Sequence, residues 1–123
     1  MKSGVLQSHV LVERLEELSD LSLGWHDGAG RALDKTKLAF ISQRLGGRYP
    51  EKISLPVIAP TLEGNLLLEW NFPGDPSVDI NLENLHAEFH MFRAGTQDME
   101  MEFDLNEDAG WTHLFDFLKH ILG

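Results

Sequence analysis

The hydrophobic positions in the first part of the chain follow a helical period. In residues 8–20, leucines recur at spacings of four and three residues, with charged side chains between them. This pattern predicts an amphipathic helix. A second apolar stripe, at residues 38–45, follows Asp34, a residue type that caps helix N-termini well. Gly46 and Gly47 are expected to end this second helix.

The middle of the chain changes to a period of two. Apolar and polar side chains alternate in four segments, which are residues 65–72, 77–83, 85–92 and 98–105. Such alternation is typical of half-buried strands, and the short turns between the segments favour an antiparallel meander. The segment LPVIAP at residues 55–60 favours a short fifth strand at a sheet edge, because proline suits an edge better than a centre.

The last segment returns to a helical period. Residues 106–122 carry an apolar stripe, and either Asn106 or Asp108 is expected to cap the helix. Three helices on one face of the sheet would bury every apolar stripe of the chain. We therefore predict one α+β domain over residues 1–123. It is a two-layer sandwich, an antiparallel meander of four to five strands with two N-terminal helices and one C-terminal helix on one face.

Composition narrows the class of protein. Hydrophobic residues make up 42% of the 123 residues and charged residues 24%, as in folded proteins, and cysteine is absent. The absence of cysteine excludes disulfides and thiolate catalysis. Residues 1–17 contain no apolar run of the kind found in secretory signals, and no segment approaches the ~20 apolar residues of a membrane span. We therefore expect a cytoplasmic protein.

The charge is distributed unevenly along the chain. The net charge is −10, yet residues 1–60 hold eight Lys and Arg against seven Asp and Glu. Residues 61–123 hold two basic residues against thirteen acidic ones. A field of this sign repels phosphate backbones and anionic membranes and attracts basic partners, so we expect neither nucleic-acid nor membrane binding. Solubility alone is the competing interpretation of the charge.

Three short motifs lie outside these periodic patterns. They are W-x-D-G-x-G at residues 25–30, P-x-x-x-P-T-x-x-G at residues 56–64, and E-W at residues 69–70. As a set they resemble a family of small uncharacterised bacterial proteins, over residues 18–92. The resemblance implies a small bacterial protein with a helix after the first motif and a strand pair after the second. It implies no activity.

The first motif permits a structural and a functional interpretation. Gly28 and Gly30 permit positive φ, so we predict a tight connection with Trp25 largely buried and Asp27 bonded to backbone amides of its own turn. The alternative is a small-ligand or enzymatic site, in which this loop meets the loop at residues 59–64. The residues of that alternative site are Trp25, His26, Asp27, Thr61 and Glu63.

The sequence gives little support for metal binding or nucleophilic catalysis. His86, Glu88 and His90 share one face of a predicted strand, but the two histidines would be about 13 Å apart, too far to share one ion. No serine lies in a G-x-S-x-G motif. The sequence therefore favours a protein without enzymatic activity, metal or cofactor.

The polar sides of the predicted strands form the main candidate surface. With the helices on one face of the sheet, the other face is open and acidic, and such a face suits rapid binding of a basic protein. The predicted partner-binding residues are Glu69, Asp79, Glu88, Glu100 and Glu102. By analogy with bacterial immunity and antitoxin proteins, we predict a non-enzymatic binding module that is a monomer or a weak homodimer. The alternative is a solvated face whose charge discourages aggregation.

Overall fold

The computed structural model describes the backbone of residues 2–123 and the side chains from residue 9 onward. Its helices are α1 (Lys2–Ser19), α2 (Lys35–Arg48) and α3 (Asp108–Leu122). Its strands are β1 (Val57–Pro60), β2 (Leu66–Glu69), β3 (Ser77–Ile80), β4 (His86–Met91) and β5 (Met99–Asp104). The five strands form one antiparallel sheet in the order β1-β2-β3-β4-β5. The predicted α+β fold and its meander are confirmed, and LPVIAP supplies the edge strand β1.

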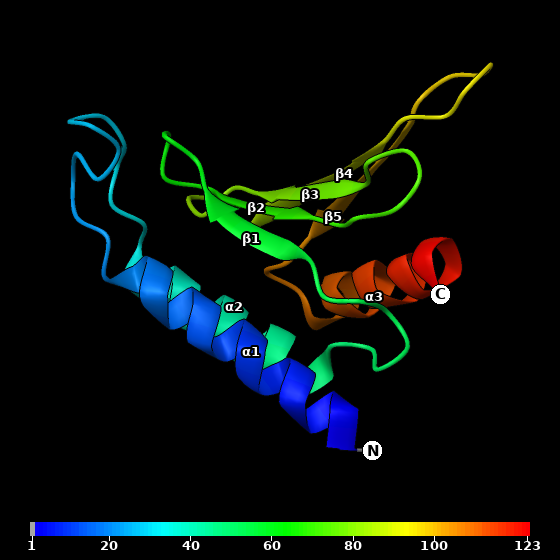
Figure 1. Cartoon of the computed structure of the whole chain (residues 1–123), viewed down its shortest axis with the longest axis horizontal. Coiled ribbons are helices and arrows are strands. Elements are labelled where there is room, and N and C mark those ends of the chain that lie inside the picture. Colours follow the sequence, from blue (N-terminus) through cyan, green and yellow to red (C-terminus); the bar gives the residue numbers. More distant parts are fainter. Residues whose placement is uncertain (1) are drawn as a thin grey trace.

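The helices and the sheet form two layers. All three helices lie beneath one face of the sheet, with α1 and α2 side by side and α3 under the other end (Figure 1). The inner face of the sheet is buried through alternate side chains such as Leu66, Val78 and Phe89. Phe117 of α3 lies against Phe89, with the ring centroids 4.8 Å apart. No helix of residues 2–123 has both the length and the apolarity needed to cross a membrane.

The helix ends differ from the predictions in three places. Asp34 caps α2 as expected, because its Oδ1 accepts a bond from the Lys37 N–H at 3.0 Å. However, α1 begins at Lys2, before the predicted residue 8, and α2 continues through its two glycines to Arg48. The helix ends at the buried Tyr49, a C-cap with an extended backbone whose N–H donates to the Leu45 carbonyl, so the two glycines do not end it. Neither predicted residue caps α3, whose N-cap is Glu107 without a side-chain bond.

Met99 and Met101 lie on β5, where the inner face of the sheet is only partly covered. The alternation puts Met99 and Met101 on the inner side of the sheet. Met99 is half-buried, but Met101 is 45% exposed. The reason is its position on an edge strand, where no further strand packs beside it. Met101 is therefore not part of the core, although it faces the inner side of the sheet.

Candidate functional site: the outer face of the sheet

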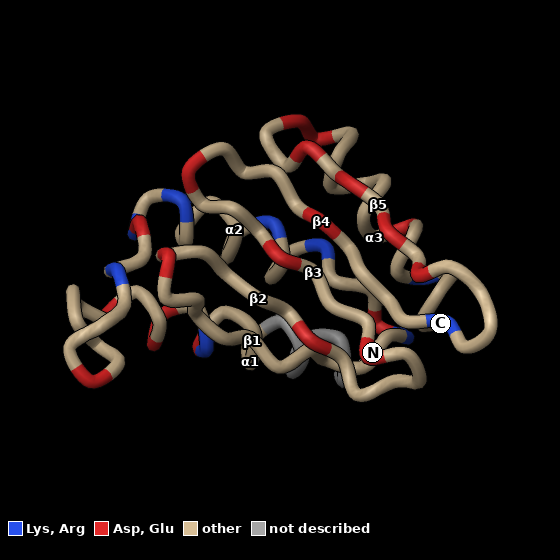
Figure 2. The backbone as a smooth tube through the Cα atoms, turned by 90° about the horizontal axis from the view of Figure 1, so that it is seen from above, with Lys and Arg blue, Asp and Glu red and all other residues tan. Residues whose placement is uncertain are grey.

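Strand register brings the five predicted acidic residues to one surface. Glu69 lies on β2, Asp79 on β3, Glu88 on β4, and both Glu100 and Glu102 on β5. Each alternates with inward-facing neighbours, so all five project from the face that the helices leave open. Figure 2 looks down on this face and shows acidic positions along all four of these strands. We call this surface the outer face.

Three carboxylates form a row across the middle of the outer face. Asp79 pairs directly with Glu88, and Glu88 pairs with Glu102, so the row crosses three adjacent strands. Like charges directly opposite each other on neighbouring strands destabilise a sheet. Within the described residues, none of these three carboxylates lies in an ion pair. We call these three residues the carboxylate row.

The electrostatics of the row favour a bound cation. Partial desolvation by the surrounding side chains raises the pKa of Asp79, and the negative charges of Glu88 and Glu63 raise it further. The row also lines a shallow hollow of about 320 Å³ that reaches from Leu67 on β2 to Glu102 on β5. A positive group in this hollow would relieve the repulsion, because an opposite charge favours the ionised carboxylate.

Histidines flank the row without neutralising it. His90 Nε2 lies 3.6 Å from Asp98 and 4.0 Å from Glu100, and His86 Nε2 lies 4.0 Å from Asp104. The pKa of Asp104 is lowered by hydrogen bonds from the side chain and the backbone of Asn106. In residues 2–123, no three His, Asp or Glu side chains converge as a metal site requires. The histidines therefore pair with acidic residues outside the carboxylate row.

The W-x-D-G-x-G loop is built around a two-residue turn. Asp27 and Gly28 both have positive φ, 49° and 89°, which is the backbone of a type I′ turn. His26 and Ala29 exchange backbone bonds of 2.7 and 2.8 Å on either side. Asp-Gly is a favoured sequence for such a turn, so both residues have a conformational role here.

Two details of our prediction for this loop are wrong. Trp25 is half-buried, and its Nε1 donates to the Arg31 carbonyl at 2.8 Å. Within the described part of the chain, no hydrogen bond reaches the Asp27 carboxylate, which is exposed. Backbone bonds alone close the turn, so the carboxylate is not required for it.

The two loops of the alternative site do meet. The Arg31 N–H donates to the Leu62 carbonyl at 2.9 Å, which ties the end of the first loop to the turn between β1 and β2. A polar cavity of about 430 Å³ lies at this junction, and Glu63 is among its lining residues. Trp25, His26, Asp27 and Thr61 do not line it. The Thr61 Oγ1 accepts a bond from the Asn65 N–H within its own turn.

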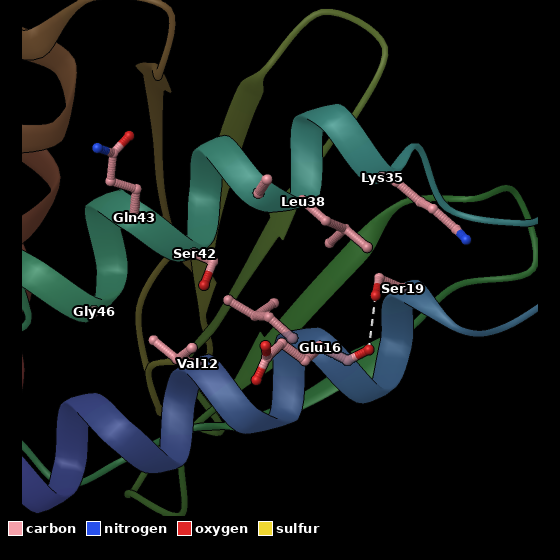
Figure 3. Close-up of a pocket in the computed structure, with 10 residues that line it drawn as sticks. Val12, Glu16, Ser19, Lys35, Leu38, Ser42, Gln43 and Gly46 are labelled. Carbon is pink, nitrogen blue, oxygen red and sulfur yellow. Dashed lines mark hydrogen bonds between the residues drawn. The ribbon is translucent and has the colours of Figure 1, made fainter.

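A groove between α1 and α2 was not predicted from the sequence. It has a volume of about 480 Å³, and Figure 3 shows Leu38 and Ser42 of α2 pointing toward α1 above Val12 and Glu16. The only sequence signal is a run of small side chains at helical spacing, Ala39, Ser42 and Gly46. Small residues between paired helices are also what close packing needs, so this signal alone does not indicate a site.

Comparisons with known proteins give no further guide to function. No protein-family model matches the chain, and no curated protein or solved structure shows a significant match. The resemblance carried by the three motifs therefore stays a prediction.

Proposed function

We propose that this chain is a non-enzymatic protein-binding module that holds a basic protein on its outer face. The observation that carries the proposal is the carboxylate row, three in-register acidic side chains on a sheet face that no helix covers. Lys and Arg side chains of a partner would supply the positive charge that the row lacks. Leu67, half-buried beside Asp79, offers apolar contact next to the charges.

Solubility alone does not account for this arrangement. Scattered surface charges keep a protein soluble, whereas carboxylates facing each other across strands lower its stability. A cationic partner removes this repulsion when it binds, so the relieved repulsion adds to the free energy of binding. On this account the row is a recognition element comparable to those of bacterial immunity and antitoxin proteins. The module acts in the cytoplasm as a monomer or a weak homodimer, without binding nucleic acid or membrane.

The proposal is tested by capture from a bacterial lysate, with titration of any captured protein in purified form. The face variant carries Asp79→Asn, Glu88→Gln and Glu102→Gln, which remove the charge of the row and keep the side-chain size. We expect a basic protein to bind the native chain at low salt and to dissociate at high salt. The face variant should lose this binding.

A matched control removes the same charge elsewhere. The control variant carries Glu16→Gln, Asp20→Asn and Glu107→Gln, three exposed positions away from the outer face. We expect it to capture the partner as the native chain does. Equal losses in both variants would show that net charge matters and the outer face does not, and equal retention in both would contradict the proposal.

A second proposal places a small-ligand site at the junction of the two loops. It is favoured by the cavity there, in which Glu63, Glu83 and Arg31 provide charges of both signs. A small polar ligand carrying an amino group fits this lining. Titration with amino acids and polyamines should shift the amide NMR signals of residues 63–65 and 81–83. Unchanged signals across these residues would exclude the site.

A further inference from the structure

The two edges of the sheet differ in how many backbone groups they offer to another strand. At the β1 edge, the Thr61 N–H donates to the Asn65 carbonyl, so these two residues form a hydrogen-bonded pair. Hydrogen-bonded and non-hydrogen-bonded pairs alternate along an antiparallel ladder, so the backbone groups of Ile58 and Pro60 point away from β2. Pro60 has no N–H to donate. The Ile58 carbonyl already accepts a bond of 2.9 Å from Arg14 Nε of α1. This edge therefore lacks one donor and has one acceptor already engaged, so it is less suited to pairing with a further strand.

The β5 edge is open. The Leu105 N–H donates to the Leu85 carbonyl at 2.9 Å. Hydrogen-bonded pairs recur at every second residue of an antiparallel ladder, so the backbone groups of residues 99, 101 and 103 also face β4. The N–H and C=O groups of Glu100 and Glu102 consequently point away from the sheet. Among residues 9–123, whose side chains are described, no hydrogen bond engages these outward groups. The edge can therefore accept one more strand.

Side chains along this edge specify the kind of strand that fits. On the outer face, Glu100 and Glu102 stand two residues apart and are exposed. On the inner face, Met101 lies between them and is 45% exposed. A strand added beside β5 would place alternate residues near the two carboxylates and the intervening residues near Met101.

We propose that the partner binds by adding an extended segment to β5, with Lys or Arg at alternate positions and apolar residues between them. This inference rests on the proposed function and names the part of the partner that the module recognises. The basic side chains pair with Glu100 and Glu102 and reach toward Glu88 and Asp79, the other two members of the carboxylate row. The apolar side chains cover Met101, and the backbone bonds of the edge are completed.

A second copy of the chain is a poor occupant of this edge. Two β5 strands pairing in antiparallel register about Met101 would set Glu100 of each copy opposite Glu102 of the other. Like charges directly opposite are destabilising. The acidic edge thus favours a basic segment over self-association.

The test uses the full chain and two blocked peptides of six residues, the length of β5. In one peptide Lys and Val alternate, and in the other the same residues stand in two blocks. We expect the alternating peptide to bind about tenfold more tightly, the equivalent of one or two hydrogen bonds. Its binding should protect the Glu100 and Glu102 amides from hydrogen exchange.

A pair of variants separates backbone pairing from charge. Glu102→Gln removes the charge and leaves the N–H, whereas Glu102→Pro also removes the N–H, which points outward and is not used by β4. Proline is tolerated at such edge positions, and thermal unfolding shows whether each variant folds. Glu102→Pro should bind the alternating peptide about tenfold more weakly than Glu102→Gln.

The outcomes distinguish this inference from the proposed function. If both peptides bind equally and the two variants behave alike, or if neither peptide binds, addition to β5 is overturned. The proposed function still stands in that case, provided that the face variant loses the partner and the control variant keeps it. If the face variant retains the partner, the proposed function fails as well. Exchange protection in the native chain decides the question should Glu102→Pro not fold.

Discussion

The backbone of Gly30 lies against the indole ring of Trp25. A Cβ on residue 30 would be 2.7 Å from Cε2 of the ring, closer than real side chains approach. Gly30 also has φ of +102°, which other residues rarely adopt. The second glycine of W-x-D-G-x-G therefore provides room for the tryptophan. The first, Gly28, provides the turn and has no neighbouring atom within 4 Å of a Cβ.

This difference predicts unequal effects of two alanine substitutions. Gly28→Ala introduces backbone strain alone and should destabilise the chain by about 1 kcal/mol. Gly30→Ala introduces similar strain and displaces Trp25, so it should cost at least about 1 kcal/mol more. Urea unfolding followed by circular dichroism measures both. Equal losses would mean that the contact between Trp25 and Gly30 contributes nothing to stability.

A third substitution in this loop should have little effect. The side chain of His26 is exposed, and its ring lies edge to face with that of Trp25, with the centroids 5.8 Å apart. His26→Ala should change the free energy of unfolding by no more than about 0.5 kcal/mol. Partner or ligand binding that disappears in this variant, with stability unchanged, would instead make the loop a functional site.

The burial of the Tyr49 hydroxyl should make the stability of the folded chain depend on pH in the alkaline range. Tyr49 is the only tyrosine, and its hydroxyl lies in a buried network where Trp70 Nε1 donates to it at 3.0 Å. Burial raises the Tyr49 pKa from 10.0 to about 12, although the bond from Trp70 opposes this shift. The folded chain thus holds this proton more tightly than the unfolded chain. Stability should be complete below pH 10 and decline as the pH rises toward 12.

Ultraviolet absorbance of the tyrosinate measures this directly, since no other tyrosine contributes. The native chain should ionise well above the pH at which the urea-unfolded chain does. A native midpoint near 10 would show that the Tyr49 hydroxyl is accessible to water. Tyr49→Phe should remove the absorbance change and thereby confirm its assignment.

The ionised Asp79 carboxylate of the carboxylate row should lower the stability of the folded chain. The pKa of Asp79 is raised, so the folded chain gains stability as the pH falls through that pKa, and the ionised group destabilises it at neutral pH. Asp79→Asn should therefore stabilise the chain at pH 7, by about 0.2–1 kcal/mol. Glu69→Gln is the matched control, because Glu69 faces Val57 and Ser77 and no carboxylate. Thermal unfolding of both variants should show the gain for Asp79→Asn alone.

Sequence periodicity was sufficient to predict the order of elements and both faces of the sheet. Period-two alternation placed Asp79, Glu88 and Glu102 on a common face before their register was known. The pairing of these residues across β3, β4 and β5 depends on turn lengths and could not be read from alternation. The exposure of Met101 likewise depends on its place on an edge strand, which is set by the order of strands in the sheet.

The loops were harder to predict than the strands. Asp27 and Gly28 indicate a turn by residue type, but the burial of Trp25 depends on where the whole loop lies. The contact between the Arg31 N–H and the Leu62 carbonyl joins segments thirty-one residues apart through backbone atoms, and backbone contacts leave no signal in side-chain patterns. The bond from Arg14 to the Ile58 carbonyl at the β1 edge also joins distant segments, so periodicity does not indicate it.

The central claim is that the outer face binds cationic protein segments through the carboxylate row. Its most direct test is a titration of the isotope-labelled chain with a short lysine-rich peptide, followed through backbone amide shifts at low and high salt. We predict saturable shifts centred on Asp79, Glu88 and Glu102 that vanish at high salt. Shifts centred on the cavity beside Glu63, or weak shifts spread evenly over all acidic residues without saturation, would contradict the account.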